Sequence, residues 1–375
     1  MASELSVDQE LAFGKPEVSN LVEHLAERIR KEGKITFHDW MAAALYHPSD
    51  GYYNRSDLKR WGREGDYRTS PERSELFAAT FARYFASIHR CMGEPSDWVV
   101  VEIGSGGGEF AAGVLETLKQ KFSNAYESMR YVAVDVSQDA RRRTAERLEK
   151  FDNTSVVEFK DVTPGNSMIV FSNELLDAFP VHRVTKVDGK VKEFYITLSN
   201  ESKFEWIVDD VSDGSIAQYC NNSLAEGQIA EVSPAVVRWF EQLGQKVESG
   251  YVVTVDYGAE AEELYNITQR KQGTLRAFRR HQFVDDVLES PGECDITSSV
   301  DWTFVKTVGQ RYGFEVEEFD RLDKFLMKAG ILEQLEERLA NSINDADRAQ
   351  LTTAAREMIL PGGMASTFQV LVQKR

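Results

Sequence analysis

Apolar and polar residues over the first hundred positions follow a helical period. Over residues 19–31 an apolar residue recurs every four positions after a Ser-Asn pair, which predicts a helix that ends at Gly33. Residues 37–45 repeat the pattern before a proline and a glycine break it. A third helix is predicted to start at Pro71, with acidic residues in its first turn. We therefore expect residues 1–97 to form a mainly helical N-terminal cap.

From residue 98 onward, short apolar runs alternate with amphipathic segments. The runs predict strands, and the segments between them have helical spacing. Strands are expected at 98–103, 131–137, 156–162, 168–179 (ending in polar residues), 250–258 and 367–375, with helices at 106–121 and 138–151. Such an alternation indicates a mostly parallel α/β sheet covered by helices on both faces. Ligands bind such sheets at the carboxyl ends of the strands.

Two additions interrupt this core, which is expected to span residues 98–375. The first, over about 182–248, begins with alternating strands around a turn at Asp188-Gly189, and we expect an antiparallel hairpin attached to the sheet. The second, over about 323–360, has helical spacing. No internal repeat or low-complexity linker separates them, so the additions are expected to pack on one body.

The first expected core strand ends in a glycine loop, EIGSGGGEF. Glycines at 104, 106 and 108 let a ligand approach the main-chain N–H groups closely. A dinucleotide-binding loop would need a further glycine at position 109, which is Glu109. An acid at Glu102 followed by this loop suits a ligand with an ammonium group and a nucleoside but no pyrophosphate. The alternative is a tight strand-to-helix turn without a ligand.

The next two strands supply further acids at their carboxyl ends. Asp135 is placed to accept both ribose hydroxyls, as the corresponding acid does in dinucleotide folds. Asp161 can accept from an adenine amino group, although it can equally be a solvated or capping acid. Together these features predict a pocket for S-adenosylmethionine. The expected donor contacts in this part of the chain are Glu102, Gly104, Ser105, Gly106, Gly108, Asp135, Val136, Asp161 and Val162.

The fourth strand leads into SNELLDAF, where a methyl acceptor is expected beside the donor's sulfonium. Glu174 and Asp177 are three residues apart, and two such carboxylates can hold a guanidinium through bidentate hydrogen bonds. We therefore expect Asn173, Glu174 and Asp177 to be catalytic. The alternative is that Asn173 caps the following helix and that Asp177 is solvated.

An upstream turn could cover this site. In GDYRTSPE, Gly65 opens a turn and Thr69 offers a hydroxyl that could reach the donor's methionine carboxylate. A capped helix start explains the same residues equally well. Downstream, GTLRAFRRHQ gathers basic residues and His281, a cluster more typical of a solvated face than of catalysis.

Composition narrows the classes of partner. The 375 residues carry a net charge of −17, which repels nucleic acids and anionic membranes, so neither is expected as a partner. Three scattered cysteines indicate neither disulfides nor a metal site. No apolar run is long enough to span a membrane, and the N-terminus lacks signal-peptide and transit-peptide patterns, so a cytoplasmic location is expected.

Several separated blocks, from about Leu21 to the C-terminus, resemble the MidA family of class I methyltransferases. The blocks are ITFHDWMAAALYHPSDGYY, GREGDYRTSPERSELFA, VVEIGSGGGEF, FSNELLDAFPVHRV, VDYG at 255–258, and GTLRAFRRHQ with PGECDITSSVDW. Two departures occur. The loop reads GSGGGE where the family usually has a proline and an arginine, and Asp135 stands where glutamate is common.

The resemblance implies a class I, Rossmann-like fold with a seven-stranded, mostly parallel sheet, α/β insertions and a helical N-terminal region that closes over the site. Mitochondrial members of the family are complex I assembly factors that methylate an arginine on a core NADH dehydrogenase subunit. The resemblance therefore implies that this chain is an S-adenosylmethionine-dependent protein arginine N-methyltransferase. Its expected partner is a protein with an exposed arginine, such as an NADH dehydrogenase subunit.

Two other functions use the same donor pocket. An assembly chaperone would bind the donor without turnover, and a small-molecule methyltransferase would have a closed apolar acceptor pocket. The polar residues after the fourth strand favour an enzyme over the chaperone. An NAD-dependent oxidoreductase is the least favoured, because Glu109 breaks the dinucleotide loop.

Overall fold

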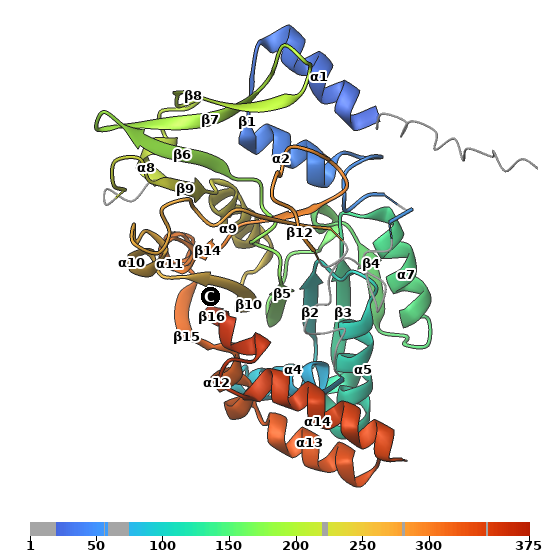
Figure 1. Ribbon diagram of the computed structural model, residues 1–375. Coiled ribbons are helices and arrows are strands. Elements are labelled where there is room, and N and C mark those ends of the chain that lie inside the picture. Colours follow the sequence, from blue (N-terminus) through green and yellow to red (C-terminus); the bar gives the residue numbers. More distant parts are fainter. Residues whose placement is uncertain (1–19, 56, 59–74, 220–223, 280–281, 343) are drawn as a thin grey trace, which may run out of the picture.

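The computed structural model describes residues 20–55, 57–58, 75–219, 224–279, 282–342 and 344–375. Its centre is a sheet with the strand order β15-β16-β10-β5-β2-β3-β4 (Figure 1). These strands are β2 (Trp98–Ile103), β3 (Met129–Val134), β4 (Thr154–Val157), β5 (Met168–Asn173), β10 (Gly250–Ala259), β15 (Glu315–Arg321) and β16 (Phe368–Lys374). The short strand β14 (Val300–Asp301) extends the sheet beside the end of β10. The predicted seven-stranded α/β fold is confirmed.

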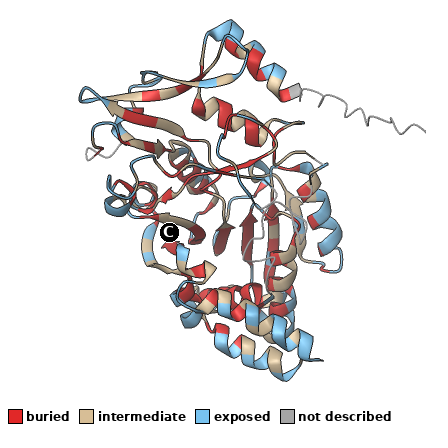
Figure 2. Cartoon of the chain, in the orientation of Figure 1, coloured by how far each residue is buried: buried red, intermediate tan, exposed pale blue. Residues whose placement is uncertain are grey.

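Five neighbouring strands, β10, β5, β2, β3 and β4, run parallel, whereas β16 is antiparallel to both of its neighbours. Every residue of β2 is buried, which explains why its sequence is apolar except for Glu102. Figure 2 shows this burial along the central strands. The pattern of apolar residues did not predict β15, because most residues of its sequence, EVEEFDR, are charged. It lies at the sheet edge, where polar side chains can reach solvent.

Helices cover both faces of the sheet. One face packs against α4 (Glu75–Cys91), α5 (Glu109–Lys121), α12 (Leu322–Ala329), α13 (Ile331–Ala340) and α14 (Asp345–Ile359). The other packs against α9 (Ala235–Lys246) and α11 (Trp302–Arg311). Shorter elements near the sheet are α6 (Ser123–Glu127), α7 (Gln138–Leu148), α10 (Ala261–Leu264), and the 3-10 turns η1 (Phe159–Asp161) and η2 (Met364–Thr367). The helices expected over 323–360 are α12, α13 and α14.

The 182–248 addition forms a separate sheet, in the order β1-β7-β6-β9 with β8 beside β7. Its elements are β1 (Ile35–Thr36), β6 (His182–Val187), β7 (Lys190–Leu198), β8 (Phe204–Asp210), α8 (Ile216–Tyr219) and β9 (Ile229–Val232). The hairpin turn at Asp188-Gly189 is confirmed. The expected attachment to the main sheet was wrong, because β10 already occupies the free edge of β5.

The N-terminal helices belong to two different packing clusters. The helices α1 (Asn20–Glu32) and α2 (Phe37–Tyr46) pack with residues of the second sheet, and β1 pairs directly with β7. By contrast, α4 packs against α5 in the core of the methyltransferase sheet. A third small sheet joins β11 (Arg276–Arg279), β12 (Gln282–Phe283) and β13 (Asp295–Thr297). The region expected as one cap, residues 1–97, is thus divided between two hydrophobic clusters.

No helix in the described part of the chain is long and apolar enough to cross a membrane.

Candidate active site

The glycine loop follows β2 and passes over the end of β3. The Gly104 and Ser105 N–H groups both donate to the Val134 carbonyl, at 2.8 and 3.1 Å. Gly104 and Gly106 have φ of +75° and +55°, a region in which other residues are strained. The loop therefore depends on glycine for its path at the carboxyl edge of the sheet.

Asp135 ties this loop to the next one. Its Oδ2 accepts from the Gly106 N–H at 3.0 Å, and its Oδ1 accepts from the Ser137 N–H at 2.8 Å. Each carboxylate oxygen can accept a further hydrogen bond. Asp135 thus fixes the glycine loop at the edge of the sheet where the sequence predicts the ribose of the donor.

Two features beside Asp135 fit a bound nucleoside. Val136 is 65% exposed, unusual for an apolar residue at the end of a core strand, and its side chain can cover an adenine face. The Ser105 hydroxyl is buried and has no hydrogen-bond partner among the described residues. A buried polar group without a partner costs free energy, so a ligand that pairs with it is stabilising.

Other predicted donor residues have structural contacts instead. At Gly108, φ is +78°, and a Cβ would lie 3.1 Å from the Thr144 backbone, so this glycine permits close packing of α7. Glu102 is buried in the sheet and accepts from the Tyr131 hydroxyl at 2.9 Å. Burial raises the pKa of Glu102 to about 8.

The third predicted strand ends earlier than expected. β4 stops at Val157, and Asp161 lies in the 3-10 turn η1, exposed, rather than at a strand end. Val162 is buried, and its carbonyl accepts from the Lys246 ammonium at 2.7 Å. A strand to residue 162 was a wrong expectation, because this segment leaves the ladder to form a turn. The predicted lid residues Gly65 and Thr69 lie outside the described residues.

The residues after β5 are those that the sequence predicts on the acceptor side of the site. The Asn173 side-chain amide donates to Glu174 Oε1 at 3.0 Å, and the Asn173 Oδ1 is buried without a partner in the described part of the chain. Glu174 has φ of +51°, a strained conformation for a residue with a side chain. Its N–H donates to the Val255 carbonyl of β10 at 2.9 Å, which helps to hold that conformation.

Asp177 is only 4% exposed and is not the solvated acid of the alternative interpretation. Its Oδ2 accepts from the Tyr257 hydroxyl at 2.6 Å. Burial, together with the nearby Asp256 carboxylate, raises the pKa of Asp177 well above its usual range. A cation bound here would favour the ionised form and lower that pKa.

Asp256 is a site residue that the sequence reasoning did not assign. It is fully buried at the end of β10, and its Oδ2 accepts from the backbone N–H groups of Leu175, Leu176 and Asp177 at 3.1, 2.9 and 3.4 Å. Burial, followed by the nearby Glu174 charge, raises the pKa of Asp256 to about 7. Asp256 therefore fixes the loop that carries Glu174 and Asp177. Its place at the carboxyl end of a predicted core strand was the available signal.

A pocket of about 830 Å³ opens beside these residues and fits the size of a ligand site. Its wall includes Glu174, Asp177, Tyr257 and Asp295. Asp295, on β13, accepts from the Tyr53 hydroxyl at 2.7 Å, which links the N-terminal segment to the pocket. The structure thus brings Asp295 to the same pocket as Glu174 and Asp177, which lie more than a hundred positions earlier in the sequence.

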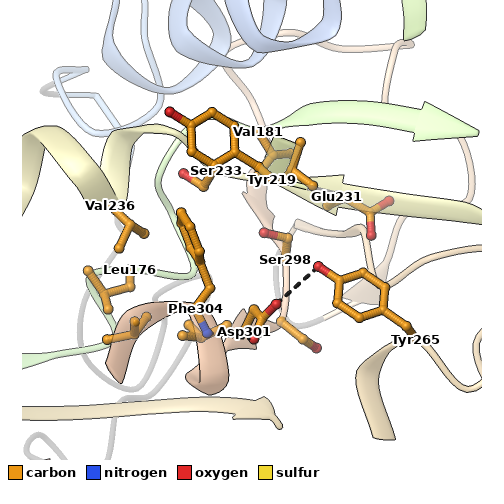
Figure 3. Close-up of a pocket in the computed structure, with 14 residues that line it drawn as sticks. Leu176, Val181, Tyr219, Glu231, Ser233, Val236, Tyr265, Ser298, Asp301 and Phe304 are labelled. Carbon is orange, nitrogen blue, oxygen red and sulfur yellow. Dashed lines mark hydrogen bonds between the residues drawn. The ribbon is translucent and has the colours of Figure 1, made fainter. Parts of the chain in front are cut away.

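A second, much smaller cavity lies behind the loop after β5. Figure 3 shows it between Leu176, Val236, Phe304 and the Tyr265–Asp301 pair, whose hydrogen bond measures 3.1 Å. Its volume is about 30 Å³, far below the roughly 300–1,000 Å³ of small-molecule sites. It cannot hold a substrate.

The strand order and the glycine loop over β2 define the class I, S-adenosylmethionine-dependent methyltransferases. A family model described as "Putative S-adenosyl-L-methionine-dependent methyltransferase" matches residues 80–319, and the chain belongs to this family. S-adenosylmethionine is its cofactor, and the chain is a methyltransferase.

Similar proteins support this assignment. The chain is 27% identical to a mitochondrial protein of Drosophila melanogaster named protein arginine methyltransferase NDUFAF7 homolog, over 94% of this chain and 84% of that protein. It is 26% identical to the mitochondrial protein arginine methyltransferase NDUFAF7 of Homo sapiens, over 94% and 82%. A crystal structure from Burkholderia thailandensis, bound to S-adenosyl-homocysteine, has 28% identity and a TM-score of 0.84 and covers 98% of this chain and 95% of that one.

Proposed function

We propose that this chain transfers a methyl group to a guanidinium nitrogen of a protein arginine, on a subunit of the NADH dehydrogenase type found in respiratory complex I. The names of the similar proteins support the arginine acceptor. The observation that carries the proposal is the convergence of Glu174, Asp177 and Asp295 in one pocket at the end of β5. A guanidinium remains protonated at neutral pH, so its binding is favoured by carboxylates. The cytoplasmic location stays a prediction.

Bound S-adenosylmethionine supplies a methyl group on a positively charged sulfur. The protein's task is then to place one guanidinium nitrogen in line with that methyl group and to handle the charge. Glu174, oriented by the Asn173 amide, accepts guanidinium hydrogen bonds at the end of β5. Its strained φ directs the side chain away from the strand path.

Asp177 has a different role from Glu174. Its Oδ2 is occupied by the Tyr257 hydroxyl, and its Oδ1 is buried without a partner among the described residues. An N–H of the substrate guanidinium would satisfy that oxygen. As the N–C bond forms, the methyl–sulfur bond would break and S-adenosyl-homocysteine would leave. The proton lost by the guanidinium would pass to one of the two carboxylates and then to solvent, and the carboxylates would stabilise the charge that remains on the methylated product.

The donor side of the proposal assigns the ribose hydroxyls to Asp135, the adenine face to Val136 and close backbone contacts to Gly104, Ser105 and Gly106. Glu102 and Gly108 are assigned structural roles beside the glycine loop and no direct contact with the donor. Gly65 and Thr69 remain a predicted lid.

The test is to incubate the protein with S-adenosylmethionine labelled in its methyl group and with a lysate of its host. We expect label in the protein fraction, recovered as methylarginine after acid hydrolysis. Label in small molecules alone would identify a small-molecule methyltransferase. Donor binding without any transfer of label would support the chaperone alternative.

A further inference from the structure

The acceptor pocket continues into a second depression. A pocket of about 630 Å³ lies along α10, β15 and the start of α11, and it shares Glu263, Arg321 and Gln369 with the acceptor pocket. The acceptor pocket alone approaches the upper end of the roughly 300–1,000 Å³ that small-molecule sites occupy. The two depressions, here called the acceptor groove, therefore have room for more than one side chain.

Acidic residues dominate the acceptor groove. In the described part of the chain, seven acidic side chains and three arginines line it. The acidic residues are Glu174, Asp177, Glu260, Glu262, Glu263, Asp295 and Asp320. Among the described residues, the buried Asp177 Oδ1 has no hydrogen-bond partner. The groove thus carries more negative charge than is required to bind one guanidinium.

Existing ion pairs only partly neutralise the outer acids. Arg270 lies 3.6 Å from Glu263, Lys306 pairs with Glu260, and Lys328 lies 2.7 Å from Asp320. All three pairs are at the surface, where such contacts contribute little and can be exchanged. For Glu262, which is exposed on α10, the described residues provide no ion-pair partner.

Aromatic side chains give the groove an apolar component. Trp302 and Phe319 line the outer part, and Phe278 and Tyr257 line the inner part. Two cations already lie over these rings: the Lys306 ammonium is 4.2 Å from the Phe319 centroid, and the Arg276 guanidinium is 5.8 Å from that of Tyr257. Long cationic side chains are compatible with such a surface, because their stems pack on rings while their charges face carboxylates.

We propose that the acceptor groove binds the residues that flank the target arginine, and that it selects a polypeptide segment carrying lysine or arginine beside that target. The inference rests on the proposed arginine methylation and adds the class of substrate segment to it. A small neutral metabolite would leave the outer acids unused. A nucleic acid would be repelled by them.

Binding of two fluorescent peptides tests the proposal, with S-adenosyl-homocysteine present to fill the donor site. Each peptide has a central arginine, flanked on both sides by either lysines or glutamates. By fluorescence anisotropy we expect the lysine peptide to bind about tenfold or more tightly in low salt, and the difference to shrink as salt screens the charges. Glu262→Lys should weaken the lysine peptide about three- to fivefold.

Glu205→Lys is the matched control, because Glu205 is exposed on β8, in the other sheet, and the change in net charge is the same. Its affinity for the lysine peptide should remain near that of the wild type. The proposed role of the groove would be wrong if the two peptides bound with equal affinity, or if the two variants lost equal affinity for the lysine peptide. Methylarginine formation in the host lysate is measured separately. If methylarginine forms but the protein does not prefer the lysine peptide, only the proposed role of the groove is wrong. If the protein prefers the lysine peptide but forms no methylarginine, the proposed reaction is wrong.

Discussion

The Asp256 carboxylate accepts a hydrogen bond from the backbone N–H of Leu176 at 2.9 Å, and this contact joins two neighbouring strand ends. Asp256 lies within β10, whereas Leu176 belongs to the loop after β5. The same oxygen also accepts from the Leu175 and Asp177 N–H groups. A buried carboxylate can replace several lost water contacts in this way. The conformation of the acceptor loop is therefore set by the adjacent strand.

Replacing Asp256 tests this positioning role. Asp256→Asn keeps the size of the side chain but puts an NH2 group where backbone donors converge, or leaves some of them unpaired. We expect kcat to fall about tenfold or more, corresponding to ~1.4 kcal/mol, with donor affinity nearly unchanged. Single-turnover rates and calorimetric titration with S-adenosyl-homocysteine measure the two effects. Asp209→Asn, an exposed position on β8, is the control and should change neither.

The proposed catalytic role of Glu174 predicts a loss of turnover without a loss of donor binding. Glu174→Gln retains the shape and one acceptor oxygen but removes the charge that aligns the guanidinium. We expect kcat/KM for methylarginine formation to fall about a hundredfold or more, as when a positioned charge in an active site is removed. Glu205→Gln removes an exposed acid of the same type on β8, outside the acceptor groove, and should retain full activity. Full turnover in Glu174→Gln would remove this residue from the mechanism.

The donor site makes a separate prediction at the glycine loop. Gly104→Val should abolish S-adenosyl-homocysteine binding, because φ of +75° strains any side chain there and the new branches would occupy donor volume. Gly189→Val is a matched control: φ is +72° in a hairpin turn, with no atom within 4 Å of a built Cβ. It should strain the backbone similarly but leave donor binding intact, as measured by calorimetry.

Asp135 is predicted to contribute by accepting hydrogen bonds from the ribose hydroxyls of the donor. Asp135→Ala should weaken binding of the donor at least tenfold, about 1.4 kcal/mol, because charged acceptors of two hydroxyls are lost. It also removes the bonds to the Gly106 and Ser137 N–H groups. Asp135→Asn keeps acceptor atoms there and should lose less affinity. Unchanged affinity in both variants would exclude the ribose contact.

Glu102 predicts a pH dependence of stability. Its pKa rises from 4.5 in an unfolded chain to about 8 in the fold, so the folded state binds the extra proton between these values. The stabilising contribution is complete below pH 4.5 and is lost as the pH rises through 8. Glu102→Gln does not titrate. We expect the stability of this variant relative to the wild type to increase as the pH is raised from 5 to 9. The difference in the free energy of unfolding should change by on the order of 3 kcal/mol, and it is followed through the melting temperatures of the two proteins.

Glu116→Gln, at an exposed position on α5, serves as the control for this pH series. Its melting temperature should follow the wild type at every pH. A constant difference between Glu102→Gln and the wild type would show that Glu102 does not titrate in this range.

The local sequence predicted the core elements correctly where apolar residues recur at a regular spacing. The buried run of β2, the helical spacing of α1 and α2, and the Asp188-Gly189 turn were all predicted, because each depends on neighbours within a few residues. The glycine loop was equally local, since its path requires φ values that glycine alone adopts easily. Class and donor chemistry were accordingly accessible from the sequence.

Contacts between distant segments were decided by the tertiary structure. Pairing of β1 with β7 joins residues 35–36 to residues 195–196, and no local pattern encodes that choice. The charged strand β15 forms because the edge of β16 offers it hydrogen bonds. Likewise, Asp256 becomes a loop anchor only when β10 lies beside β5. The sequence alone determined which residues could form strands, turns and a donor loop; the fold decided which carboxylates meet, because burial and hydrogen bonding across strands depend on neighbours far apart in the chain.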